Sequence, residues 1–160
     1  MTRHDHAASC CDELTLDDAA DRCRARGASL TPIRRAVLGL LLEEAGGIKA
    51  YDLLDRIKKQ HRSATPPTVY RALDFLIEQG LAHRIARTNQ FVACHHEGHD
   101  QAALFLVCPE CGTVTELHDD EALAGLMEGL KAAGHTLASP EIELSATCSD
   151  CSRRRPSRDA

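Results

Sequence analysis

The sequence contains no tryptophan, and its other aromatic residues are three Phe and two Tyr among 160 positions. With hydrophobic residues at 43% and so few aromatic side chains, the core must be built from Leu, Ile, Val and Ala. Small aliphatic side chains of this kind suit packing between helices. A chain of this length holds one medium-sized domain or two small ones.

Long apolar runs are also missing. No stretch approaches the roughly 20 apolar residues of a membrane span, and no apolar segment follows basic residues in the manner of a secretory signal. We therefore expect a cytoplasmic protein without a membrane partner. Because the cytosol is reducing, the eight cysteines are expected to bind metal rather than to form disulfides.

Four of the cysteines form two C-x2-C pairs, Cys108/Cys111 and Cys148/Cys151, with 36 residues between the pairs. A turn over two residues directs both sulfurs of a pair toward one centre, and Gly112 permits the positive φ that such a turn often needs. Two pairs supply four thiolates, the ligand set of a tetrahedral structural zinc site. The alternatives are two disulfides or buried free thiols.

Two enzyme classes use related cysteine patterns. A thiol oxidoreductase would use Cys108-Pro-Glu-Cys111 at a helix N-terminus, which lowers the pKa of a thiol, but residues 112–117 alternate like a strand. A zinc deaminase needs H-x-E followed by P-C-x-x-C. The segment His95-His96-Glu97 fits the first half, but proline follows Cys108 instead of preceding it.

A second group of side chains that bind transition metals surrounds the first cysteine pair: His83, Cys94, His95, His96, His99 and Glu116. They exceed the needs of one tetrahedral site, so the sequence predicts a second metal site. A zinc hydrolase at this histidine-rich segment is an alternative, and it would keep one coordination position open for water. Exposed histidines are common, so any single one is equally well explained as a solvated loop residue.

The net charge of −5 hides an uneven distribution. Residues 48–90 hold eight Lys or Arg against four Asp or Glu, a local charge of +4, whereas residues 1–47 sum to −2 and residues 91–160 to −7. A basic middle segment on an acidic protein points to DNA as a partner. The alternative is an ordinary solvated face.

Four segments in the first half have helical periodicity: residues 14–26, 32–45, 50–60 and 66–79. The fourth places Val69, Leu73 and Leu76 on one apolar face and ends at Gly80. Residues 81–86 and 90–94 alternate as a hairpin around Thr88-Asn89. Helices followed by a hairpin predict a winged-helix DNA-binding domain over residues 12–94, preceded by a flexible arm at 1–11.

The second half predicts a smaller α/β unit over residues 95–152, so the fold class is α+β. Residues 103–108, 112–117 and 142–146 alternate as strands, and 119–133 form a helix that begins with acidic residues. Such a short unit has little core of its own, and a zinc clamp and a second copy of the chain would supply the missing stability. Residues 153–160 predict a disordered basic tail.

Taken together, these segments resemble the ferric uptake regulator (Fur) family. The likeness is carried by AYDLLDRI, PPTVYRALDFLIEQG, FVACHH and the two C-x2-C pairs, in the same order, from Leu14 to Cys151. In their individual residues, these motifs resemble the zinc-sensing branch of the family, the zinc uptake regulators (Zur). This resemblance implies a homodimeric, metal-dependent repressor of double-stranded operator DNA, not an enzyme, with a C-terminal dimerisation domain and no small organic substrate.

The resemblance also implies two Zn²⁺ ions per chain. The structural zinc falls on Cys108, Cys111, Cys148 and Cys151. The regulatory zinc falls on His83, Cys94 and Glu116, but Gln101 stands where zinc-sensing relatives carry the fourth ligand, a histidine. We assign that ligand to His99, with His96 as the substitute. A third site of iron-sensing relatives is not expected, because the position of one of its histidines is Pro140.

Ligand chemistry supports zinc independently of the resemblance. A thiolate from Cys94 with imidazoles and one carboxylate suits zinc, whereas Fe(II) sites are built from His and carboxylate alone. An iron- or peroxide-sensing repressor is the alternative within the family. The expected DNA-binding side chains are Tyr51, Thr68, Tyr70 and Arg71, and arginine reads guanine through two hydrogen bonds. Tyr70 packed against the hairpin is the alternative for that residue.

Overall fold

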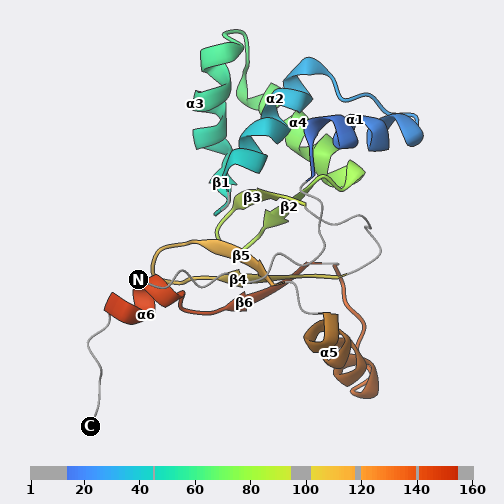
Figure 1. Cartoon of the computed structure of the whole chain (residues 1–160), viewed down its shortest axis with the longest axis vertical. Coiled ribbons are helices and arrows are strands. Elements are labelled where there is room, and N and C mark those ends of the chain that lie inside the picture. The colour runs from blue at the N-terminus through green and yellow to red at the C-terminus, as the bar shows by residue number, and fades with distance from the viewer. Residues whose placement is uncertain (1–13, 45, 95–101, 118–119, 140, 155–160) are drawn as a thin grey trace, which may run out of the picture.

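The computed structural model describes residues 14–44, 46–94, 102–117, 120–139 and 141–154. Four helices and a small sheet form the upper half of the molecule, and a second sheet with two further helices forms the lower half (Figure 1). The predicted α+β class, a winged-helix domain followed by a smaller sheet domain, is confirmed. Among the described residues no helix combines the length and apolar character needed to cross a membrane.

The N-terminal half is built on α1 (Leu16–Ala25), α2 (Pro32–Glu43), α3 (Ala50–Gln60) and α4 (Pro66–Gln79). Thr15 begins α1 with a capping box to Asp18, and α2 and α4 both begin with proline in the first turn, where its fixed φ is favourable. Gly80 ends α4 in the left-handed conformation, with φ 68°. The apolar faces of these helices form one core around fully buried leucines.

The wing is a three-stranded antiparallel sheet in the order β1-β3-β2. Strands β2 (Ala82–Ile85) and β3 (Gln90–Ala93) form the predicted hairpin, and its turn contains Asn89 at φ 53°, a conformation that asparagine tolerates. Strand β1 (Ile48–Lys49) was not predicted, because two residues are too short to show alternation.

The C-terminal sheet has the order β5-β4-β6. Strand β4 (Ala103–Val107) is central, β5 (Val114–Leu117) pairs antiparallel to it, and β6 (Glu141–Ser145) pairs parallel to it. Helix α5 (Asp120–Ala132) makes the crossover between β5 and β6 and lies beyond the sheet, away from α1–α4 (Figure 1).

A last helix, α6 (Ser149–Arg154), corrects the prediction of a disordered tail from residue 153. Arg153 and Arg154 belong to this helix, and both donate to Asp150 one turn earlier. Six residues are too few for the periodicity that predicted the other helices. The remainder of the predicted tail, residues 155–160, and the predicted arm at residues 1–11 lie outside the described residues.

The wing and the C-terminal sheet share a second apolar core. Ile85 and Val92 of the wing pack with Phe105, Val107 and Val114 of the sheet, and Phe105 is 1% exposed. Packed interiors have discrete rather than continuously deformable arrangements. We call this contact between the wing and the C-terminal sheet the junction. A change in packing on one side of it therefore alters the packing on the other side.

Gly47, directly before β1, provides a test of the wing. Its φ is +80°, and a Cβ there would stand 3.0 Å from Val92 Cγ1. We expect Gly47→Ala to lower the free energy of unfolding by about 1–3 kcal/mol, because it adds backbone strain and crowds β3. Gly39→Ala in α2 is the control, since its Cβ meets only Leu16 at 3.7 Å. Urea denaturation of Gly47→Ala at fixed protein and zinc concentration should show the loss, and wild-type stability would contradict it.

Candidate metal centres and nucleic-acid interface

The four cysteines of the two C-x2-C pairs meet in one cluster, in which all four sulfurs lie within 4.8 Å of one another. Cys108 follows β4, Cys111 closes the turn next to Gly112 (φ 72°), and Cys148 and Cys151 lie at the start of α6. Because β4 and β6 are parallel, their C-terminal ends lie at the same end of the sheet, and both cysteine pairs follow these ends.

The sulfur spacing fits zinc and not a disulfide. The Sγ atoms of Cys111 and Cys148 are 3.7 Å apart. Tetrahedral zinc with Zn–S bonds of about 2.3 Å separates its sulfurs by about 3.8 Å, whereas a disulfide brings them to about 2.05 Å. Among the described cysteines none is paired in a disulfide. The cluster therefore fits a tetrahedral metal with four thiolate ligands.

Local hydrogen bonds favour the thiolate form at one side of the cluster. The backbone N–H of Cys148 donates to Cys108 Sγ at 3.5 Å, and this bond with the backbone of Cys111 lowers the pKa of Cys108 to about 6. The hydroxyl of Thr113, 3.2 Å from Cys111 Sγ, likewise lowers the pKa of Cys111. Burial and the neighbouring thiols raise the pKa of Cys151 to about 12. Four thiolates so close together need a cation between them.

Arg154 places a positively charged guanidinium beside the cysteine cluster. Its Nη2 donates to Cys151 Sγ at 3.4 Å, and its Nε donates to the carbonyl of Asp150 at 3.2 Å. The sequence alone did not indicate this contact, because residue 154 was expected to lie in the disordered tail. Once α6 is known, the spacing of Cys151 and Arg154 at i and i+3 on one helix face indicates it.

The predicted regulatory ligands His83 and Cys94 also come together. His83 on β2 is 5% exposed and hydrogen-bonds the Cys94 thiol, and its Nδ1 lies 3.1 Å from Glu141 Oε1 on β6. Burial alone lowers the pKa of His83, but the contacts with Cys94 and Glu141 outweigh burial and raise it to about 9. Glu141 is a functional candidate that the sequence analysis did not identify.

Glu116 lies on the same side of the junction as Phe105. The two residues are opposite each other in the β4–β5 register, and the Phe105 ring centroid is 5.3 Å from that of His83. Within the described ranges only the four cysteines bring three or more potential ligand atoms within 4.8 Å of one another, so the ligand atoms of His83, Cys94 and Glu116 are not gathered as closely in this structure. The predicted fourth ligand His99 and its substitute His96 lie outside the described residues.

The predicted DNA-binding side chains lie on the exposed ends of two helices. Tyr51 in the first turn of α3 is 74% exposed, and Tyr70 in α4 is 48% exposed. Arg71 is exposed beside it, and Thr68 is half-buried with its hydroxyl 2.9 Å from that of Thr65. An aromatic ring and a guanidinium on one exposed helix face suit contact with a nucleic-acid groove.

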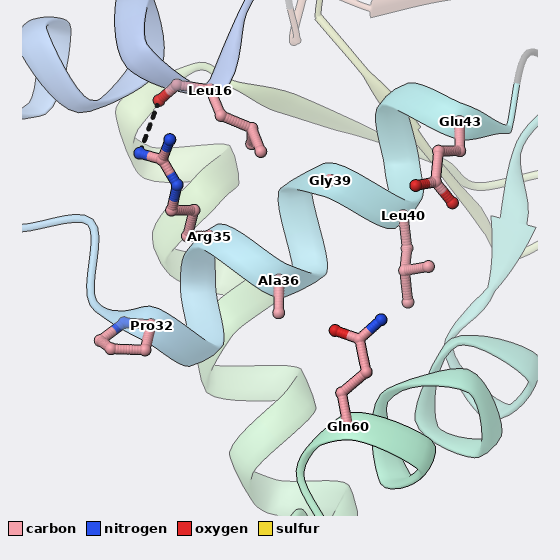
Figure 2. Close-up of a pocket in the computed structure, with 8 residues that line it drawn as sticks. All are labelled: Leu16, Pro32, Arg35, Ala36, Gly39, Leu40, Glu43 and Gln60. Atoms are coloured by element: carbon pink, nitrogen blue, oxygen red, sulfur yellow. Dashed lines mark hydrogen bonds between the residues drawn. The ribbon is translucent and has the colours of Figure 1, made fainter.

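One pocket of about 340 Å³ lies between α1, α2 and α3, far from both groups of metal-binding residues in sequence. Figure 2 shows its lining residues Leu16, Pro32, Arg35, Ala36, Gly39, Leu40, Glu43 and Gln60. Arg35 donates to the carbonyl of Leu16 at 3.3 Å and pairs with Asp17 at 2.6 Å, which ties α2 to α1. The lining contains neither a thiol nor an imidazole, the groups on which the enzyme alternatives depend.

The chain matches the sequence model described as the ferric uptake regulator family over residues 25–145. It belongs to the ferric uptake regulator family. The zinc uptake regulation protein of Escherichia coli (strain K12) is 40% identical over 138 residues, which cover 85% of this chain and 80% of that protein. The zinc uptake regulation protein of Mycobacterium tuberculosis (strain H37Rv) is 32% identical over 119 residues, covering 74% of this chain and 91% of that protein.

A solved structure of a zinc uptake regulator in complex with zinc and DNA superposes with a TM-score of 0.75 at 39% identity, covering 86% of this chain and 93% of the other. The predicted resemblance to the family and to its zinc-sensing branch is thus confirmed. More distant relatives include a peroxide operon regulator from Bacillus subtilis, which is 24% identical over 149 residues.

The cysteine cluster gives a direct test of the metal. We expect Cys148→Ser to lose one zinc per chain and, with it, free energy of folding on the order of several kcal/mol, because the cluster ties β4 to α6. Cys23→Ser, which removes a buried thiol outside the cluster, should keep its zinc. Zinc counting by atomic absorption, together with thermal unfolding, decides the matter. An unchanged zinc content in Cys148→Ser would contradict the assignment.

Proposed function

We propose that this protein is a cytoplasmic, zinc-responsive transcriptional repressor. In this proposal it binds operator DNA as a dimer when its regulatory zinc site is filled, and it controls zinc uptake genes. The observation that carries the proposal is a four-thiolate cluster of zinc geometry within a winged-helix chain. The similarity to a zinc uptake regulator solved with zinc and DNA supports both partners.

Helix α4 acts as the recognition helix in this proposal. Its exposed Tyr70 and Arg71 face a major groove with Thr68, and Tyr51 contacts the flanking backbone. The local positive charge of the surrounding segment favours phosphate contacts. Two such helices in a dimer would read successive major grooves about 34 Å apart.

The C-terminal half, proposed to span residues 95–152, provides the dimer surface, and residues 12–94 form the DNA-binding domain. Leu126 and Met127 of α5 are 38% and 37% exposed, and Leu117 and Leu144 on the sheet are also exposed. Exposed apolar side chains on a unit with so small a core favour burial against a second copy. The zinc cluster holds this unit together, so zinc and dimerisation both compensate for its small core.

The regulatory zinc is proposed to use His83, Cys94, Glu116 and His99, which brings the total to two Zn²⁺ per chain. His83 and Cys94 are already in contact at the junction of the wing and the C-terminal sheet. A thiolate among the ligands favours zinc over Fe(II). When bound, zinc supplies a cation that holds the junction residues in one arrangement, and it shifts the population only by its differential affinity for that arrangement.

Three alternatives have weaker support. An iron- or peroxide-sensing repressor is consistent with the family, but it would not need the buried Cys94 beside His83. A thiol oxidoreductase would use the first cysteine pair, which is followed by β5 and not by a helix. The related proteins are named as regulators, which argues against a zinc hydrolase as well.

The regulatory site is tested by Cys94→Ser. We expect a folded dimer that retains one zinc per chain but gains no operator affinity when zinc is added, because the cysteine cluster is intact while the junction site is not. Gel shifts against the gene's own upstream region with zinc, iron or chelator measure the response. Cys23→Ser is the matched buried-thiol control and should respond as the wild type does. Unfolding of the Cys94→Ser dimer would contradict the assignment.

The recognition face is tested by Arg71→Ala. Loss of a bidentate contact with guanine should cost about 1–3 kcal/mol of operator binding and much less of nonspecific binding. Lys59→Ala, at the exposed end of α3, is the control and should weaken binding equally for all sequences. Fluorescence anisotropy with operator and scrambled DNA at two salt concentrations separates these effects. Intact operator preference in Arg71→Ala would show that the face is wrong.

A further inference from the structure

Two acidic side chains of β6 reach across the junction to the wing. Glu141 Oε1 lies 3.1 Å from Nδ1 of His83, and the carboxylate of Glu143 accepts the backbone N–H groups of Ala86 and Arg87 at 2.6 and 3.1 Å. Residues at i and i+2 of a strand point to the same face. One face of β6 therefore holds the wing through two carboxylates.

The Glu141 contact fixes the state of the His83 ring. An ionised carboxylate can only accept, so Nδ1 carries the proton that it donates to Glu141. In the neutral imidazole the lone pair is then on Nε2, and this nitrogen becomes the metal-binding atom. His83 is 5% exposed, so its ring is held by these protein contacts and not by bulk water.

We propose that Glu141 is the positioning residue that orients His83 for the regulatory metal. Metal-ligating histidines usually donate their second N–H to a carboxylate or carbonyl, which fixes the tautomer and makes the ligating nitrogen more basic. Glu141 acts through His83 and does not itself bind the metal. This inference rests on the proposed regulatory site and adds a residue to it.

The contact also links the metal site to the C-terminal sheet. His83 belongs to β2 of the wing, whereas Glu141 belongs to β6, where it is opposite Ala103 of β4. Because Glu141 orients His83 from the other side of the junction, the geometry with which His83 binds a metal depends on how the two halves are packed. Glu141 therefore couples metal affinity to the arrangement of the wing.

Glu143 provides a matched control. It lies on the same strand and face, and it also crosses the junction, but its partners among the described residues are the backbone amides of Ala86 and Arg87, just after β2. Glu143→Gln weakens an interdomain carboxylate contact without touching the His83 ring. Any effect shared by Glu141→Gln and Glu143→Gln comes from the junction, and an effect confined to Glu141→Gln comes from the histidine.

The experiment uses the full-length zinc-loaded dimer and its Glu141→Gln and Glu143→Gln variants. Competition with a chromophoric chelator gives the affinity of the second zinc. Long-range ¹H–¹⁵N NMR of the zinc-free regulatory site, recorded above the His83 pKa of about 9 so that the ring is neutral, gives the tautomer of His83. We expect Glu141→Gln to bind the second zinc about 10- to 100-fold more weakly and to lose the pure Nδ1–H tautomer. Glu143→Gln should keep both properties.

Three results would overturn the inference. Wild-type affinity and tautomer in Glu141→Gln would show that the contact has no role in binding. An equal loss in both variants would assign the effect to the junction. Complete loss of the second zinc in Glu141→Gln, as in His83→Ala, would make Glu141 a ligand. A wild-type chain that holds one zinc and ignores added zinc would overturn the proposed function itself, a result distinct from these three.

Discussion

The register between β4 and β6 is the constraint on which the rest of the structure depends. These strands are far apart in sequence and pair in parallel, so no tight turn sets their alignment. The four-cysteine cluster lies directly beyond this pairing, because Cys108 follows β4 and Cys148 follows β6, and one metal ion bound there would fix the register. A shift of one residue would move every β6 side chain to the other face. Glu141 would then no longer face His83, and the cluster therefore governs contacts well beyond the metal.

The wing is part of two cores at once. Its strands close the helical core through Phe91 and Ala93, while Ile85 and Val92 pack on the C-terminal sheet. A DNA-binding unit attached only by a linker would move independently of the sheet. Here the hairpin that follows α4 is itself the contact surface, so packed side chains connect α4 to the C-terminal sheet.

Local signals and long-range signals differ sharply in how well the sequence revealed them. Helix α4 was predicted at its observed bounds because proline, an apolar stripe and Gly80 all agree, and the cysteine cluster followed from spacing alone. The contact between His83 and Glu141 spans 58 positions and depends on strand register, which periodicity does not specify. Strand β1 and helix α6 were missed because they are short, and Arg154 was missed with α6.

The two groups of metal-binding residues differ in what their binding energy accomplishes. All four cysteines belong to one unit, so metal binding there is folding energy for that unit. His83 and Cys94 belong to the wing, whereas Glu141 and Glu116 belong to the sheet. In the proposed function, a metal bound across the junction would stabilise one packing of the two halves over others, and only that difference could reach DNA. In the proposed function, zinc is therefore a fixed clamp in the cysteine cluster and a switch at the junction, because the location of the ligands, and not the metal, sets its role.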